Sequence, residues 1–263
     1  MAKIAIATLL RGVESGFEKW EKTLVIIRNQ SIIKNFNKDC DLIFFHEGNL
    51  GEKYKSKIKS FQSIFNSSNN SKININIKFV EVPDFQISNE TLSYLNSKTL
   101  DMGNIRTGYS SMCRFWSFGF LNYIDEYDYV IRIDDDCIVL NIFENIISSL
   151  ENRYICFPAV SRENYREGFV DFLKMYFDKP VIDETQIDTP YTNFCGFNIN
   201  KIKKDKRILN FFREIENNHF IHKYSWTDTL LWGIIIKYFL KNDDYLKMNK
   251  IQYIHLSHLA YVN

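Results

Sequence analysis

The amino-terminal third of the chain alternates apolar runs of strand length with segments of helical periodicity. Lys3 to Leu9 and Cys40 to Phe45 are apolar runs typical of buried strands, and Ile73 to Val82 alternates like a strand. Between them, apolar residues recur at helical spacing over 17–27 and 54–61. This β-α-β-α-β order favours a parallel sheet with right-handed crossovers, so we expect an α/β fold.

Composition limits the class of protein. The chain has 263 residues, of which 45% are hydrophobic and 25% charged, as expected for one large folded domain. A net charge of +1 argues against a nucleic-acid binder that relies on a basic surface. The 5 cysteines are scattered without a CxxC pair, which is typical of free buried thiols in a reducing compartment. We find no signal peptide and no apolar run of about 20 residues, so we expect a cytoplasmic protein without a transmembrane segment.

The remainder of the sequence predicts further strands and helices. An apolar segment near the carboxyl end has no polar face, so we expect a helix that is buried on every side. The predicted elements, in chain order, are an irregular surface segment over Pro83–Gly108, a helix that Thr107 or Ser110 can cap and whose apolar face spans 112–123, strands over Tyr127–Ile133, Tyr154–Val160 and Phe194–Ile199, the apolar helix over 229–240, and a short strand or arm over Ile251–Tyr261.

Three consecutive carboxylates, Asp134, Asp135 and Asp136, directly follow the apolar strand Tyr127–Ile133. Like charges this close repel one another, and strand alternation points Asp134 and Asp136 to the same side. A hard divalent cation such as Mg²⁺ or Mn²⁺ prefers oxygen ligands and often shares carboxylates with substrate phosphates. Ligands in open α/β sheets bind beyond the carboxyl ends of strands, where this cluster is expected. The sequence therefore predicts a metal site, and the alternative is a solvated acidic turn.

Other residues are candidates for the same site. Arg114 lies among large apolar residues of the predicted helix and needs an anionic partner, either a nucleotide diphosphate or a carboxylate of the Asp134–Asp136 cluster. Asp228 begins the apolar helix, where it can act as an N-cap or take a proton from a hydroxyl group. His255 or His258 can supply a nitrogen ligand to Mn²⁺, and Arg11 follows the first strand. The alternatives are a structural ion pair, a helix cap, structural histidines and a surface arginine.

Two blocks of the sequence resemble the fungal α-1,2-mannosyltransferases of glycosyltransferase family 15. That family has a Tyr-Arg-x-Met-Cys-Arg-Phe-like helix, and the counterpart here is Tyr109–Phe115. The family's Tyr-Asp-Tyr-Tyr-Trp-Arg-Val-Glu-Pro-Asp strand resembles Tyr127–Asp136, with Asp-Asp-Asp in place of Glu-Pro-Asp. Further similarities are the strand end Leu9–Arg11, the segment Phe220–Asp228, and a late histidine, either His255 or His258.

The resemblance implies the nucleotide-diphospho-sugar transferase (GT-A) fold, a mixed and mostly parallel sheet flanked by helices in a single domain over 1–263. Residues 1–140 would form a nucleotide-sugar-binding half and residues 141–263 an acceptor-binding half. The implied activity is the metal-dependent transfer of a sugar, such as mannose, from a GDP- or UDP-sugar to a hydroxyl of a glycan or glycoconjugate. Whether the transfer retains or inverts the anomeric configuration stays open.

The resemblance also assigns roles to individual residues. Mn²⁺ or Mg²⁺ would be held by Asp136 together with His255 or His258. Asp228 would lie near the reacting sugar or the acceptor, as the base if the enzyme inverts. The residues implied in donor binding are Arg11, Tyr109, Arg114, Asp134 and Asp135.

Two other functions remain open from the sequence. A nucleotidyltransferase that makes sugar nucleotides also needs carboxylate-bound Mg²⁺ on an α/β sheet. Such enzymes usually have a glycine-rich phosphate loop near the amino terminus, which Leu9–Glu14 matches poorly. The other alternative is a catalytically silent module that binds a sugar or a partner protein.

Overall fold

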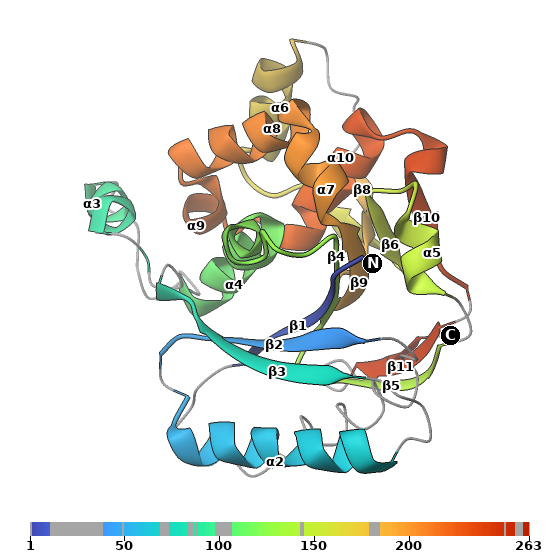
Figure 1. The fold of residues 1–263 in the computed structure, drawn as a ribbon. Coiled ribbons are helices and arrows are strands. Elements are labelled where there is room, and N and C mark those ends of the chain that lie inside the picture. Colours follow the sequence, from blue (N-terminus) through green and yellow to red (C-terminus); the bar gives the residue numbers. More distant parts are fainter. Residues whose placement is uncertain are drawn as a thin grey trace.

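The computed structural model describes residues 2–10, 39–48, 50–68, 74–83, 87, 89–97, 107–142, 145–178, 185–249, 251–255 and 260–262. Within these residues, a 7-stranded sheet has the order β10-β6-β9-β4-β1-β2-β3 (Figure 1). Its strands are β1 (Ile4–Leu10), β2 (Cys40–His46), β3 (Ile75–Glu81), β4 (Tyr129–Ile133), β6 (Ile155–Phe157), β9 (Phe194–Asn198) and β10 (Tyr245–Lys247). β9 runs antiparallel to β4 and β6, and the other neighbours pair in parallel. The predicted mixed, mostly parallel sheet is confirmed.

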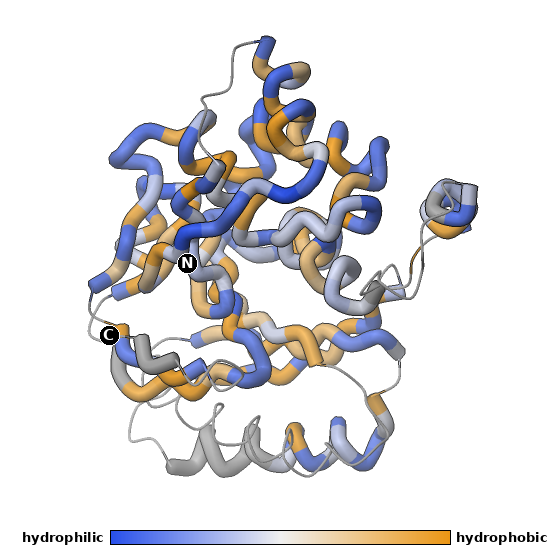
Figure 2. The backbone as a smooth tube through the Cα atoms, turned by 180° about the vertical axis from the view of Figure 1, so that it is seen from behind, coloured by the Kyte–Doolittle hydropathy of each residue, from blue (hydrophilic) through white to orange (hydrophobic). Residues whose placement is uncertain are grey.

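Helices cover both faces of this sheet (Figure 1). One face packs on α2 (Glu52–Ser68), and the other lies under α4 (Thr107–Ser117), α8 (Lys206–Asn217), α9 (Phe220–Tyr224) and α10 (Asp228–Phe239). Every residue of β1 is buried because its side chains alternate between the two layers. Ala5 and Ala7 join the core under α4 and α10, whereas Ile4 and Ile6 join the core on the α2 side. Apolar residues accordingly gather along the central strands (Figure 2).

Smaller elements complete the described structure. A 3-stranded sheet of order β12-β11-β5 extends from the strand that follows the acidic cluster, and β7 pairs with β8. These elements are β5 (Cys137–Ile142), β7 (Val160–Asn164), β8 (Gln186–Pro190), β11 (Ile251–His255), β12 (Ala260–Val262), α3 (Asn89–Ser97), α5 (Ile146–Leu150), α6 (Phe169–Phe177), α7 (Ile199–Lys204) and two 3₁₀ helices, Gly119–Tyr123 and Asn242–Asp244. None of the described helices combines the length and the apolar composition that crossing a bilayer requires.

Several predicted elements need correction. The helix expected over 112–123 ends at Ser117, because Phe118 leaves helical geometry with φ −152° and ψ −23°, and a 3₁₀ helix follows. The strand expected over Tyr154–Val160 is two strands, β6 and β7, which Pro158 separates. The segment expected to be irregular contains α3. The helix expected over 17–27 lies outside the described residues.

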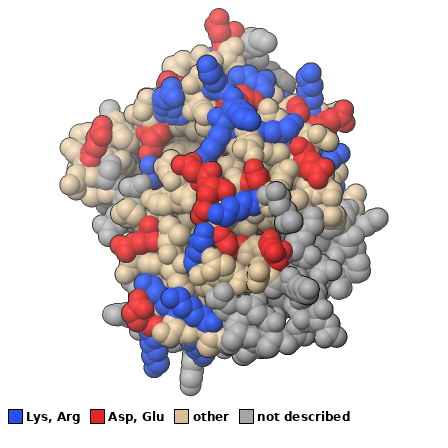
Figure 3. All heavy atoms as spheres, viewed as in Figure 1, with Lys and Arg blue, Asp and Glu red and all other residues tan. Residues whose placement is uncertain are grey.

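The apolar helix is confirmed as α10, although it is not buried on every side. From Asp228 to Ile235 every residue except the partly exposed Thr229 is buried, whereas Lys237 in the last turn is exposed. All 5 cysteines are free and buried, as the sequence predicted. On the face shown in Figure 3, basic and acidic residues are interspersed, in line with the small net charge.

Candidate active site

The acidic cluster lies in a tight turn between β4 and β5, at the carboxyl edge of the parallel strands. The Asp134 amide donates to the Asn193 carbonyl at 2.9 Å, and the Cys137 amide donates to the Asp134 carbonyl at 3.0 Å. These backbone bonds fix the turn, so the three carboxylates leave the end of a buried strand with side chains that are only partly exposed. Asp135 occupies the middle of this turn. The position that the sequence predicted for the cluster is confirmed.

Arg132 is the cation that faces this cluster. It is 2% exposed, and its guanidinium donates to Asp134 twice, from Nε to Oδ1 at 2.7 Å and from Nη2 to Oδ2 at 3.0 Å. Its Nη1 donates to Asp228 Oδ2 at 2.5 Å, and the guanidinium lies 4.5 Å from the Trp116 ring centroid. Burial alone would lower the pKa of Arg132, but the carboxylates of Asp134 and Asp228 outweigh it and raise that pKa. Arg132 therefore stays charged and holds the two carboxylates together.

Asp228 begins α10 but does not cap it. The cap is Thr227, whose Oγ1 accepts from the Leu230 amide at 3.2 Å, so the N-cap role considered for Asp228 is wrong. Asp228 is 4% exposed and also accepts a bond from Thr192 Oγ1 at 2.8 Å. Its carboxylate is thereby held against Arg132 of β4 and against Thr192 in the loop between β8 and β9.

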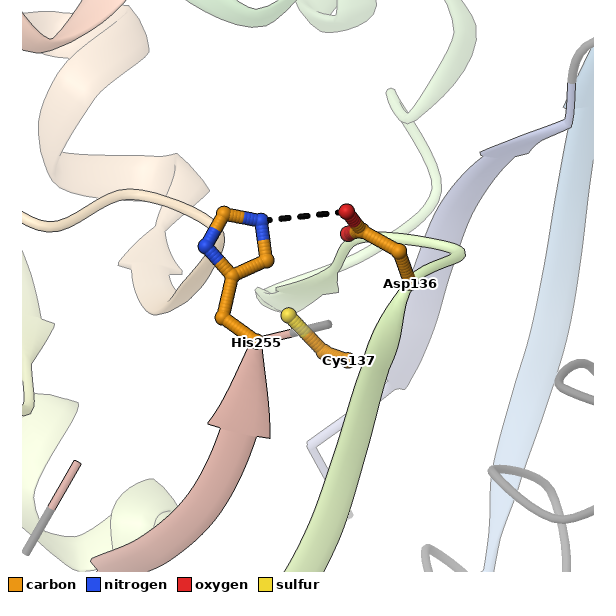
Figure 4. A group of neighbouring side chains, drawn as sticks. All are labelled: Asp136, Cys137 and His255. Atoms are coloured by element: carbon orange, nitrogen blue, oxygen red, sulfur yellow. Dashed lines mark ion pairs between the residues drawn. The ribbon is translucent and has the colours of Figure 1, made fainter. Parts of the chain in front are cut away.

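Asp136 and His255 lie side by side, as the proposed metal pair requires (Figure 4). His255 Nε2 is 3.2 Å from Asp136 Oδ2, and His255 Nδ1 is 2.9 Å from the Tyr191 hydroxyl. The bond to Tyr191 orients the ring so that Nε2 faces the carboxylate, which is how a metal-ligating histidine is usually held. The Cys137 sulfur completes a group whose ligand atoms all lie within 4.8 Å of one another. His258 and Arg11 lie outside the described residues.

Two further groups face the same region. Tyr109 on α4 is 40% exposed, and burial of its hydroxyl, together with nearby Cys113, Asp228 and Glu163, raises the pKa of Tyr109. Glu163 on β7 accepts hydroxyl bonds from Thr227 at 2.9 Å, from Thr189 at 3.3 Å, and from Thr229. Tyr109 therefore lies close to the carboxylates of both Glu163 and Asp228.

Arg114 has a different anionic partner from those expected. Its Nε donates to both carboxylate oxygens of Glu216 on α8, at 2.7 and 2.9 Å, and its guanidinium stacks 5.6 Å from the Phe118 ring centroid. The predicted need for an anionic partner is confirmed, but within the described residues the acidic cluster is served by Arg132 instead. A role of Arg114 in donor binding stays a prediction.

Sequence reasoning did not single out Arg132, Glu163 or Tyr191. The signal for Arg132 was present, because an arginine in an otherwise apolar strand needs a buried anionic partner. No local pattern identifies Glu163 or Tyr191, since their partners come from distant parts of the chain.

A buried histidine behind α4 gives a testable pH dependence. His222 on α9 lies 3.3 Å from Ser111 Oγ, and burial, with the Arg114 charge adding, lowers the pKa of His222 to about 4. In the unfolded chain, His222 binds a proton near pH 6.5, well above the pH at which it does so in the folded protein. Acidification below pH 6.5 therefore stabilises the unfolded state relative to the folded state. We expect the free energy of unfolding to fall by up to about 1.4 kcal/mol per pH unit between pH 6.5 and 4, with no contribution from this group above that window.

Urea denaturation at several pH values between 7 and 4 measures this effect, with His222→Gln as the comparison because carboxylates also titrate there. In the variant, the free energy of unfolding should fall less steeply with decreasing pH than in wild type. Equal slopes for wild type and variant would contradict the assignment.

No family model matches this sequence, and no curated protein matches it by sequence. Solved structures do match it. Core-mannan synthase A from Aspergillus fumigatus, in its Mn/GDP form, has a TM-score of 0.71 at 14% identity, with 97% of this chain and 75% of that chain covered. The mannosyltransferase Ktr4p from S. cerevisiae has a TM-score of 0.72 at 16% identity, with 97% and 70% covered.

A structure of mouse xyloside xylosyltransferase 1 also matches, with a TM-score of 0.55 at 12% identity and 94% and 85% of the two chains covered. At these identities the likeness establishes architecture. The chain has the single-domain GT-A fold of these glycosyltransferase structures, as its sequence predicted.

Proposed function

We propose that this protein is a metal-dependent glycosyltransferase that moves a sugar from a nucleoside-diphosphate sugar to a hydroxyl of a glycan or glycoconjugate. The observation that supports this most directly is the pairing of Asp136 with His255 at the carboxyl edge of the sheet. The proposal also draws on the similar structures, one of which is described with Mn and GDP and another with GDP. GDP-mannose is therefore the first donor to test.

The donor atoms fit a manganese or magnesium ion. A carboxylate oxygen and an imidazole nitrogen oriented by Tyr191 suit Mn²⁺, and the partly exposed Asp136 side chain leaves the site accessible. Asp136 and His255 would hold the ion, with His258 as the other histidine that the resemblance implies. When bound, the ion supplies positive charge that stabilises the departing nucleoside diphosphate.

The remaining residues of the site bind and orient the sugar. Asp134, fixed by Arg132, would accept a hydrogen bond from a ribose or sugar hydroxyl, with Asp135 beside it. Tyr109 offers an exposed ring, and Glu163 and the buried Asp228 offer carboxylates near its hydroxyl. Asp228 is the group placed to take the acceptor proton if the enzyme inverts. Arg11 and Arg114 would contact the nucleotide by resemblance alone.

The proposed division into a donor half, 1–140, and an acceptor half, 141–263, places Asp136 and His255 in different halves. The antiparallel pairing of β5 with β11, in which Cys137 lies opposite His255, joins them. A metal bound there would connect the two halves of the domain directly.

Calorimetry with GDP and UDP tests this function, each with Mn²⁺ and with a chelator. We expect GDP to bind in the presence of Mn²⁺ and to lose at least about tenfold in affinity when the metal is removed, a difference of about 1.4 kcal/mol.

Mn²⁺-dependent release of GDP from GDP-mannose would then identify an enzyme. Nucleotide binding without turnover of any GDP- or UDP-sugar would favour the silent module. Formation of a sugar nucleotide from a nucleoside triphosphate and a sugar phosphate would favour the nucleotidyltransferase.

A further inference from the structure

The proposed metal pair has a third neighbour with metal-binding chemistry, the thiol of Cys137. Cys137 lies directly opposite His255 in the antiparallel pairing of β5 with β11, so both side chains point to the same side of this small sheet (Figure 4). Asp136 immediately precedes Cys137 and turns its carboxylate towards the same imidazole. The carboxylate oxygen, the sulfur and the ring nitrogen all lie within 4.8 Å of one another.

We propose that Asp136, Cys137 and His255 form a mixed oxygen, sulfur and nitrogen site that binds Zn²⁺ more tightly than Mn²⁺, and that zinc bound there displaces Mn²⁺ and inhibits the protein. The inference rests on the proposed function for the shared ligands Asp136 and His255. Beyond that function, it states that Cys137 is a zinc ligand and that Zn²⁺ and Mn²⁺ compete for one site.

The chemistry of the three donors supports zinc. Mn²⁺ prefers oxygen and nitrogen ligands and binds most sites weakly, whereas Zn²⁺ binds the same sites more tightly and accepts thiolate readily. A tetrahedral zinc ion holds its sulfur and nitrogen ligands roughly 3.5 Å apart. Cys137 is 1% exposed, so it would be the innermost ligand beneath the partly exposed Asp136.

The surroundings of Cys137 allow it to change partner. Its Sγ donates to the Asn193 carbonyl at 3.6 Å, which is a long and weak bond that costs little to give up. The Tyr191 hydroxyl keeps the His255 ring oriented with Nε2 towards Asp136 whichever metal is bound.

Geometry explains why zinc would inhibit. Zinc held by three protein ligands in a tetrahedral site has one open position. Mn²⁺ held by Asp136 and His255 alone would keep more positions open for the phosphates of the donor, because Mn²⁺ takes a higher coordination number than tetrahedral Zn²⁺. The thiol therefore determines whether the bound ion can accept the donor.

Cobalt is the probe for the thiol, because thiolate-bound Co²⁺ gives an intense near-ultraviolet charge-transfer absorption that oxygen and nitrogen ligands do not give. The 263-residue protein titrated with Co²⁺ should show this band, and Zn²⁺ should abolish it. Cys137→Ser should lose the band, whereas Cys40→Ser, which removes another buried thiol on β2, should keep it. Absence of the band in cobalt-loaded wild-type protein overturns the proposal and needs no variant.

Paramagnetic resonance of free Mn²⁺ measures the competition. Zn²⁺ should displace Mn²⁺ from wild-type protein, and Cys137→Ser should weaken zinc binding at least about tenfold while Mn²⁺ binding changes less. Cys137→Ala serves as a second variant, and thermal unfolding checks that both fold. Equal zinc affinity in wild type and folded variants overturns the proposal even where Mn²⁺ still binds. Failure of Mn²⁺ to bind at all would instead count against the proposed function, since the cobalt band reports Cys137 independently.

Discussion

Replacing Arg132 with methionine is expected to lower the free energy of unfolding by about 3–5 kcal/mol. Arg132 is 2% exposed and donates to Asp134 and Asp228, so the variant leaves two carboxylates facing each other without a compensating charge. Methionine fills a similar volume against Trp116, so the loss of packing is small by comparison. Chemical denaturation of wild type and variant at pH 7 measures the difference.

The pH dependence of this variant separates an electrostatic cause from a packing cause. Burial already raises the pKa of Asp134, and without Arg132 this effect is no longer opposed by a positive charge, so the folded variant binds a proton at Asp134 more readily than its unfolded chain does. The deficit of the variant relative to wild type should therefore shrink as the pH falls from 7 towards 5. Adding Asp228→Asn to Arg132→Met should restore part of the loss, because one unpaired charge is removed. A deficit below about 1 kcal/mol, or one independent of pH, would contradict the buried ionic network.

The same network shows what the sequence could and could not predict. Strands β1, β2 and β4 were predictable because they are mostly apolar, with Asp41 and Arg132 as the charged exceptions in β2 and β4, which is close to the pattern of a strand buried on both faces. The acidic cluster was predictable because it follows one of these strands without a break. Local sequence alone was sufficient for these features.

Features that depend on distant contacts were not predictable in this way. Arg132 and Asp228 are far apart in the sequence, and only the packing of α10 on the sheet brings them together. The orientation of His255 depends on Tyr191, and the setting of Glu163 depends on three threonines from two other elements. Periodicity reports which face of an element is buried, but it does not report which partner lies across that face.

The pairing of Arg114 illustrates this limit. An arginine among large apolar residues predicts an anion nearby, and both the acidic cluster and Glu216 satisfy that rule equally well from sequence. The structure distinguishes these two partners. Helix α8 brings Glu216 alongside Arg114 on α4, whereas Asp134 of the acidic cluster is paired with Arg132.

Asp136→Ala is expected to reduce Mn²⁺-dependent sugar transfer, or donor hydrolysis, by roughly 10³-fold. A bound divalent ion contributes several kcal/mol of charge stabilisation to a departing diphosphate, and each 1.4 kcal/mol is about tenfold in rate. The Asp136 side chain is 25% exposed and its ion pair is with His255, so its loss should cost at most about 1 kcal/mol of stability. Initial rates in metal-buffered solution, with Mn²⁺ binding measured by paramagnetic resonance, test both parts.

A matched control distinguishes the loss of a metal ligand from the general effect of removing one negative charge from the protein. Asp188→Ala on β8 removes a carboxylate that is 71% exposed and pairs with Arg162, so it should leave the rate and Mn²⁺ binding unchanged. A rate for Asp136→Ala within about threefold of wild type, at saturating Mn²⁺ and with the fold intact, would exclude this carboxylate as a metal ligand. Weakened Mn²⁺ binding with recovery of the rate at higher Mn²⁺ would instead mean that Asp136 sets the affinity for the ion. At high Mn²⁺ concentration the other ligands would then hold the ion. The bound ion would still stabilise the transition state, because that stabilisation depends on the presence of the ion and not on which residue binds it.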